Sequence, residues 1–369
     1  MSTQMKVPYV ALGLQHAPLI DEITKAVQDV VLSGMFIGGE EVLRFERRFA
    51  ELCGTKHAVG VSNGTAALSL TMKGLGIGDG DEVITVSHSY LATASSAVLI
   101  GARPVFVDVG EDYNIDPSLI EAAITSKTRA IIPVHLTGRP AEMDALTAIA
   151  QKHSLHIIED CAQAVGAQYQ GQTVGSFGTA GCYSLHPLKN LSACGDGGVI
   201  VTNDDALADF LRKARSHGMK NRDECLFWSP NERLDALQAA ILNVKLDSLR
   251  AWNDARRVHA HAYCEALQDI VDVPWEPDYM YAVYHAFVIR AKERDALKAY
   301  LTERGIDTKI HYPIPTHLQP AAKDLGFGEG SLPLTEQLAT DILSLPVYPE
   351  LTEQQRSFVI DNIREFYTK

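Results

Sequence analysis

Long hydrophobic runs, paired cysteines and a surplus of positive charge are all missing from this chain of 369 residues. No run of about 18 apolar residues is present, which argues against a membrane-spanning helix. The opening MSTQMKVPYVALGL lacks the charged-then-apolar layout of a secretory signal. The six cysteines form no C-x-x-C pair, so we expect reduced thiols. Together these absences predict a cytoplasmic protein.

The charge balance excludes further classes of protein. Lys and Arg number 33 against 46 Asp and Glu, a formal net charge of −13, whereas a nucleic-acid-binding surface would be basic. No H-E-x-x-H motif occurs, and His259 and His261 are two residues apart and point to different helix faces, so no metal is predicted. With 46% hydrophobic and 21% charged residues, the composition is that of an ordinary globular protein.

Strand-like apolar runs alternate with helix-like stretches in the first half of the chain. The strand-like runs are 57–62, 82–86, 104–109, 130–136 and 156–159. The helix-like stretches between them are 66–73, 92–99, 119–124 and 143–153. Such alternation predicts parallel βαβ units with helices on both faces of the sheet. Two further runs, 181–185 and 198–202, have no helix between them and predict a hairpin, so the sheet should be mixed.

The second half of the chain has a different character. A helical pattern over 233–267 carries a broad apolar stripe, and Pro274 and Pro277 follow it. In the tail we expect a strand at 286–289 and helices at 294–304 and 334–344. The predicted fold class is α/β: a three-layer, mainly parallel large domain with a smaller C-terminal α+β domain. The predicted divisions are an N-terminal arm (1–15), a large domain (16–250) and a small domain (251–369).

Residues that follow the strands should meet at one edge of the sheet, where open α/β sheets bind ligands. Ser62-Asn63-Gly64-Thr65 leads from a strand into a helix, and the free N–H groups of a helix N-terminus suit a phosphate. Gly64 would let the anion approach the backbone, although the same four residues also suit a plain helix cap. Neither a P-loop nor a G-x-G-x-x-G pattern is present at this turn.

A carboxylate and an amine follow later strands. Asp160 ends an apolar strand, where it could hold the protonated nitrogen of a pyridine ring, cap a helix or form an ion pair. Glu159 is its rival, but strand alternation places the two carboxylates on opposite faces, so only one can serve. Lys189 lies in a loop shaped by Pro187 and by a glycine-rich stretch, where a lowered pKa would allow a Schiff base. Tyr90 adds an aromatic ring after another strand.

These motifs, in this order, resemble the sugar aminotransferase family of the DegT/StrS type, which uses pyridoxal phosphate on an aspartate-aminotransferase-like fold (fold type I). The resemblance covers nearly the whole chain. The matching segments are 36–39, 45–46, 62–68, 101–108, 159–164, 184–190, 195–198, 231–234, 238–240 and 311–317. The resemblance implies that Lys189 is the catalytic Schiff-base lysine and Asp160 the partner of the pyridine nitrogen. It also implies that Gln163 lies near the phenolic oxygen and that Tyr90 stacks on the ring.

Further positions follow from the same resemblance. The residues that match phosphate contacts are Gly64, Thr65 and Ser184. Asn231 matches an asparagine that reaches the phosphate from the neighbouring subunit, which implies a homodimer with shared active sites. The residues in a loop that meets the sugar are His311, Tyr312 and His317.

The resemblance therefore implies transfer of an amino group from L-glutamate or glutamine to a keto sugar, expected to be nucleotide-linked. Such a reaction would serve amino-sugar biosynthesis for lipopolysaccharide, another surface polysaccharide or a secondary metabolite. A keto-cyclitol or a keto-octulosonate stays open as the acceptor. A keto-sugar dehydratase is the alternative reaction, and retention of Lys189 counts against it, because one branch of the family that dehydrates has His there. A non-catalytic regulator on the same fold is a third possibility.

Overall fold

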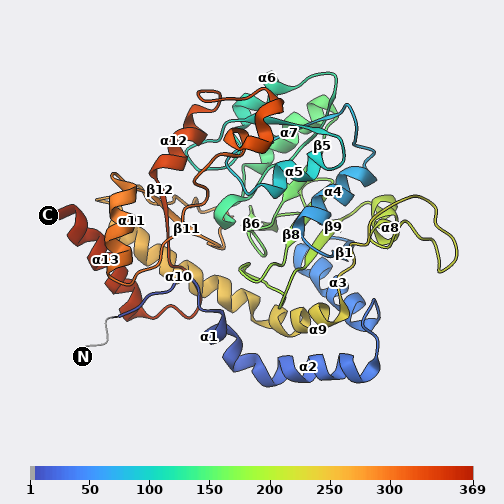
Figure 1. Cartoon of the computed structure of the whole chain (residues 1–369), viewed down its shortest axis with the longest axis horizontal. Coiled ribbons are helices and arrows are strands. Elements are labelled where there is room, and N and C mark those ends of the chain that lie inside the picture. Colours follow the sequence, from blue (N-terminus) through green and yellow to red (C-terminus); the bar gives the residue numbers. More distant parts are fainter. Residues whose placement is uncertain (1–4, 369) are drawn as a thin grey trace.

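The computed structural model describes residues 5–368 (Figure 1). Its largest sheet has seven strands in the order β1-β9-β8-β5-β4-β2-β3. These strands are β1 (His57–Val61), β2 (Glu82–Val86), β3 (Arg103–Val107), β4 (Thr128–Ile131), β5 (His156–Asp160), β8 (Ala180–Ser184) and β9 (Gly198–Thr202). Only β9 runs against the others, since it pairs antiparallel with both β1 and β8. The predicted mixed sheet, with a hairpin of β8 and β9, is therefore confirmed, and β1 lies beside this hairpin at the edge of the sheet.

Two predicted strands are shorter than expected. The run 130–136 gives a strand that ends at Ile131, because Pro133 has no N–H to donate to a neighbouring strand. The run 104–109 starts one residue earlier and ends at Val107. The carboxyl ends of the parallel strands nevertheless meet at one edge of the sheet, as the alternation predicts.

Helices cover both faces of this sheet. Helices α3 (Glu40–Cys53) and α9 (Ala236–Lys245) pack on one face, and α4 (Gly64–Gly74) and α8 (Asp205–Ala214) pack on the other. Strand β9 shows the alternation directly: Val199 and Val201 join the core under α3 and α9, whereas Ile200 joins the core under α4 and α8. The three residues are fully buried. The remaining helices near the sheet are α5 (Ala92–Val98), α6 (Ile120–Ala123) and α7 (Met143–His153).

The N-terminal segment and the C-terminal part come together in a separate core. There β11 (Phe287–Arg290) pairs antiparallel with β12 (Ile342–Leu345), and helices α10 (Leu249–Leu267), α11 (Arg294–Glu303) and α13 (Glu353–Thr368) pack around them. Val7 bridges to Ile306 in this core. The N-terminal arm is partly helical, in α1 (Leu12–His16), and α2 (Ile20–Ser33) follows it along one side of the molecule (Figure 1). Residues 1–4 of the predicted arm lie outside the described residues.

Two helix predictions need correction. The pattern over 233–267 is not one helix, because a 3₁₀ turn at Leu246–Ser248 separates α9 from α10. The pattern over 334–344 covers α12 (Pro333–Asp341) and then the first residues of β12. The change occurs because Ile342–Leu345 are fully buried against β11 and Pro346 prevents continuation as a helix.

The remaining short strands form a small sheet in the order β10 (Met280–Tyr281), β6 (Gln168–Tyr169) and β7 (Gln172–Thr173). No helix within residues 5–368 combines the length and the apolar character needed to cross a membrane.

Candidate active site

A cavity of about 700 Å³ opens at the carboxyl edge of the large sheet. Nine of the predicted site residues line it: Gly64, Thr65, Tyr90, Asp160, Gln163, Ser184, Lys189, His311 and Tyr312. They come from segments that are more than 200 residues apart in sequence, so the fold gathers them as the strand-end argument predicted.

Lys189 supplies the amine of this cavity. Its backbone N–H donates to the carbonyl of His186, and the side chain of the next residue, Asn190, is tied to Asn253 and to the Val283 carbonyl. Among residues 5–368, Nζ of Lys189 has no hydrogen-bond or ion-pair partner. Burial lowers its pKa from the ordinary 10.5 to about 8, and the charge of Asp160 opposes that change only in part. The neutral, nucleophilic form of the amine is therefore populated at neutral pH, at roughly a tenth of the molecules, where an ordinary lysine would be almost entirely protonated.

Asp160 is a carboxylate that lines the same cavity. Its side chain is buried, accepts a hydrogen bond of 2.8 Å from the Thr93 hydroxyl and accepts another of 3.1 Å from the Ala162 N–H. Burial raises the pKa of Asp160, whereas these hydrogen bonds and the charge of Lys189 lower it. A buried carboxylate with no guanidinium or ammonium in an ion pair with it, among the described residues, is well placed to receive a cationic ligand.

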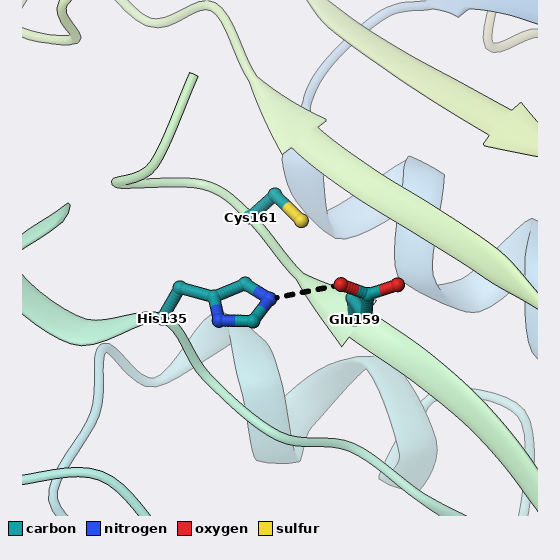
Figure 2. A group of neighbouring side chains, drawn as sticks. All are labelled: His135, Glu159 and Cys161. Carbon is teal, nitrogen blue, oxygen red and sulfur yellow. Dashed lines mark hydrogen bonds and ion pairs between the residues drawn. The ribbon is translucent and has the colours of Figure 1, made fainter. Parts of the chain in front are cut away.

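Glu159, the rival carboxylate, has a structural role (Figure 2). Its oxygens accept N–H bonds from Gly175, Phe177 and Gly178, and they accept a fourth from Nε2 of His135. Nδ1 of His135 accepts from the Ala141 N–H, so the ring proton must lie on Nε2. All of these groups lie away from the cavity, and Glu159 is thus excluded as the ring partner.

Cys161 lies beside this pair, and one potential ligand atom from each of His135, Glu159 and Cys161 falls within 4.8 Å of the others (Figure 2). The Glu159 oxygens are already engaged by four donors. Burial also raises the pKa of the Cys161 thiol well above its ordinary value, which keeps it protonated. Glu159 and His135 therefore form a structural anchor inside the fold, and Cys161 lies beside them as a buried thiol.

The N-terminus of α4 faces the same cavity. Asn63 caps this helix, since its side chain accepts from the Ala66 N–H at 2.8 Å, so the cap interpretation of the Ser-Asn-Gly-Thr turn is correct. The cap leaves the first N–H groups of α4 free for an anion. A Cβ on Gly64 would lie 2.9 Å from Cβ of Ser184, so only glycine allows these two residues so close together. Backbone N–H groups and the hydroxyls of Thr65 and Ser184 thus form a cradle that fits a phosphate.

Gln163 connects the Tyr312 wall of the cavity with the turn at Thr137. Its Oε1 accepts from the Thr137 N–H at 2.7 Å, and its Nε2 donates to the Tyr312 hydroxyl at 3.1 Å. The Tyr312 ring lies 5.9 Å, between centroids, from that of Tyr90, which is 58% exposed. Tyr90 is therefore free to cover a planar ring in the cavity.

Two predicted residues lie outside the cavity wall. The prediction that His317 meets the sugar is not supported: its side chain is fully buried, with Nδ1 bonded to Ser87 and Nε2 paired with Glu336. Ser87 directly follows β2 and Glu336 lies in α12, so the sequence around His317 gave no sign of these two contacts. Asn231 is exposed and lies between Pro230 and Glu232, which do line the cavity.

His311, by contrast, lines the cavity with its Nδ1 bonded to the Ser344 hydroxyl. Burial lowers the pKa of His311 to about 4, so its ring is neutral at neutral pH. Two residues were missed by sequence reasoning. Thr93 holds Asp160, and its signal was the strand-end segment around Tyr90. His285 lines the cavity with a buried Nδ1 that lacks a hydrogen-bond partner, and no sequence motif surrounds it.

The matches with known proteins agree with this geometry. The model of the DegT/DnrJ/EryC1/StrS aminotransferase family matches residues 18–364. The chain is 47% identical to a "Pleiotropic regulatory protein" of Geobacillus stearothermophilus, covering 98% of this chain and 99% of that protein. It is 43% identical to the "dTDP-3-amino-3,4,6-trideoxy-alpha-D-glucose transaminase" of Streptomyces venezuelae, with coverage of 98% and 96%.

A solved structure is similar over the same length. The S. venezuelae protein DesV, in complex with a ketimine intermediate, superposes with a TM-score of 0.97 at 43% identity, and the match covers 99% of each chain. The fold is therefore that of the pyridoxal-phosphate aminotransferases of fold type I, and pyridoxal phosphate is the cofactor. This chain belongs to the DegT/DnrJ/EryC1/StrS aminotransferase family, and it is a pyridoxal-phosphate-dependent transaminase.

Proposed function

We propose that this transaminase moves an amino group from L-glutamate, or glutamine, to a keto sugar linked to a nucleotide. The product would be an amino sugar for a surface polysaccharide such as lipopolysaccharide, or for a secondary metabolite. The observation that carries the proposal is the free amine of Lys189 in one cavity with the buried carboxylate of Asp160. The name of the 43% identical S. venezuelae transaminase, which refers to a dTDP-linked amino sugar, supports the acceptor class.

The residues of the cavity fit pyridoxal phosphate at each of its polar ends. The N-terminus of α4 with Thr65 and Ser184 would hold the phosphate, and Asp160 would hold the ring nitrogen in its protonated form. Gln163 would lie near the phenolic oxygen, and Tyr90 would cover the ring. The cofactor, when bound, supplies a cationic ring that withdraws electrons from the reacting carbon.

The chain itself then has to move one proton. Lys189, as a neutral amine, would take the proton from Cα of the amino donor and then deliver it to C4′ of the cofactor, the carbon of its aldehyde group. Its pKa of about 8 suits this exchange, because both protonation states are populated near neutral pH. Thr93 fixes the orientation of Asp160 throughout.

We further propose that the enzyme is a cytoplasmic homodimer in which Asn231 reaches the phosphate held by the partner copy. The exposure of Asn231 in the single chain, next to cavity-lining Pro230 and Glu232, leaves it available to such a neighbour. His311 and Tyr312 are proposed to contact the sugar, since both line the cavity beside Tyr90.

A regulatory role is the second candidate, and the name of the 47% identical Geobacillus protein favours it. A pure regulator would have no need for an amine with a lowered pKa opposite a buried carboxylate. Release of 2-oxoglutarate from L-glutamate distinguishes a transaminase from a regulator, and it also distinguishes it from a keto-sugar dehydratase.

The test uses the full chain loaded with pyridoxal phosphate. Addition of L-glutamate should change the visible absorbance of the bound cofactor and release one 2-oxoglutarate per site, and a nucleotide-linked keto sugar should then restore the starting spectrum. Lys189→Ala should slow this exchange by about 10²–10⁴-fold. Lys73→Ala is the matched control, since Lys73 is the other lysine at the cavity wall and should be dispensable for the reaction with glutamate. An unchanged spectrum in the wild-type protein, or full turnover by Lys189→Ala, would refute the proposal.

A further inference from the structure

A second cavity, of about 420 Å³, lies outside the site described above. Its walls are the loop 110–117 after β3, part of the turn 137–142 and the segment 273–284 that precedes β11. None of the residues assigned to the cofactor or the keto sugar lines it.

The two cavities share a thin wall. Thr137 lines the second cavity, and its N–H donates to Oε1 of Gln163, which lines the first. Tyr284 lines the second cavity, whereas the next residue, His285, lines the first. Thr137 and Tyr284 have left-handed φ angles of 60° and 44°, which are uncommon for residues other than glycine. A ligand in the second cavity would therefore contact Thr137 and Tyr284, which are joined directly to residues that line the first cavity.

The second cavity is acidic. Five carboxylates line it, those of Glu111, Asp112, Asp116, Glu142 and Glu276, against a single guanidinium. Ion pairs with Arg290 and Arg257 neutralise Glu111 and Glu276, and Arg139 pairs with Asp112. Two carboxylates remain in excess. One of these is Glu142, which accepts hydrogen bonds from the hydroxyls of Tyr169 and Tyr279 and lies 4.0 Å from Arg139. A cationic group would be attracted to this wall.

Arg139 and Trp275 favour two further features of a ligand, an oxygen acceptor and an apolar face. Arg139 is only 6% exposed, and its Nε, buried at the cavity wall, has no acceptor among residues 5–368. A buried N–H donor without an acceptor is costly, so a ligand oxygen there would be strongly favoured. The Trp275 ring is 65% exposed and has the Arg139 guanidinium 5.2 Å from its centroid. A ring of this kind is a platform for the apolar face of a ligand.

We propose that the second cavity binds an amino sugar. Such a molecule offers an ammonium group for Glu142 and Asp116, hydroxyl oxygens for the free N–H of Arg139, and a C–H face for Trp275. A neutral sugar lacks the ammonium group, and a simple inorganic cation lacks the hydroxyl oxygens and the C–H face. The further identification of this ligand with the enzyme's own product rests on the proposed function, and it would make the cavity a site of product sensing.

The test measures binding directly, on the full chain loaded with pyridoxal phosphate. D-Glucosamine is the probe, and D-glucose is the uncharged control. Saturation-transfer NMR measures the binding of each sugar. We expect saturable binding of D-glucosamine that is at least tenfold tighter than binding of D-glucose. Trp275→Ala and Glu142→Gln should each weaken it about tenfold. The glutamine keeps one oxygen acceptor for one of the two tyrosine hydroxyls, and its amide N–H₂ can donate to the other, so the side chain stays hydrogen-bonded while its charge is removed.

Trp228→Ala is the control, because Trp228 is 94% exposed and lies outside this cavity. Binding should be unchanged in this variant. Equal affinity of wild type and Trp275→Ala, or no preference for D-glucosamine over D-glucose, would overturn the proposal. The release of 2-oxoglutarate from L-glutamate is measured on the same samples and should be unaltered by Trp275→Ala. Failure of the binding test and failure of the proposed reaction are thus recorded separately.

Discussion

Glu159 and Asp160 are consecutive residues of β5, and their carboxylates point in opposite directions. Glu159 accepts from the N–H groups of Gly175, Phe177 and Gly178 on one side of the strand. Asp160 accepts from Thr93 on the other side and lines the cavity. The strand thereby combines a structural acid and a ligand-binding acid in two adjacent positions, because successive side chains of a strand face opposite sides of the sheet.

This division of roles gives a paired prediction. Asp160→Asn should leave the melting temperature nearly unchanged and lower kcat/KM by about 10²–10⁴-fold, because loss of one charge of a buried pair costs about 3–5 kcal/mol. Glu159→Gln should lower the melting temperature and leave kcat/KM nearly unchanged. It should cost about 2–3 kcal/mol of stability, since a glutamine amide would face N–H donors that now meet a carboxylate. Thermal unfolding and steady-state kinetics are measured for each variant. If Asp160→Asn and Glu159→Gln changed stability and kcat/KM in the same way, the assignment of one structural and one ligand-binding acid would be contradicted.

The pKa of Lys189 predicts how cofactor loading depends on pH. Burial lowers this pKa from 10.5 to about 8, and only the neutral amine can attack the aldehyde of pyridoxal phosphate. The rate of loading of the cofactor-free protein should therefore rise with pH and level off above about 8. Stopped-flow absorbance measures this rate, and Nα-acetyl-lysine is the control, whose rate should keep rising toward pH 10.5. A protein profile that follows the free amino acid would show that the lysine is not buried in this way.

Gly64 gives a prediction about the phosphate cradle. Gly64→Ala would bring a Cβ within 2.9 Å of Cβ of Ser184, so Ser184 must move away from its place beside the α4 N-terminus. We expect the dissociation constant for pyridoxal phosphate to rise about tenfold, the equivalent of about 1.4 kcal/mol. Gly328→Ala is the matched control, because nothing lies within 4 Å of its added Cβ. Fluorescence titration with the cofactor gives both constants, and unchanged affinity in Gly64→Ala would argue against this cradle.

Lys245 predicts a pH dependence of stability that is independent of catalysis. The side chain is fully buried at the end of α9, with Nζ bonded to Ser192 and to His16, and burial lowers its pKa from 10.5 to about 8. Since the folded protein gives up this proton more readily than the unfolded chain, Lys245 favours folding more as pH rises from 8 to 10.5. The melting temperature of Lys245→Met, relative to wild type, should fall by roughly 3 °C across that interval. Exposed Lys25→Met serves as the control and should show no such trend.

The amino-acid sequence determined the strands of the large sheet, the order of the site residues and the placement of Lys189 and Asp160 in one cavity. These features are readable because apolar periodicity and turn chemistry are local, and because parallel strands bring their carboxyl ends to one edge. The sequence also limited the ring partner to one of two acids, since strand alternation forces Glu159 and Asp160 apart.

Only the tertiary structure decided which long-range partners each side chain meets. His317 is withdrawn from the sugar because Ser87, 230 positions away, and Glu336 bind both of its ring nitrogens. Residues 342–345 become a strand and not the end of a helix because β11 offers them a partner. The second cavity beside Trp275 arises where three distant segments meet, and packing across such distances leaves no periodic trace in the sequence.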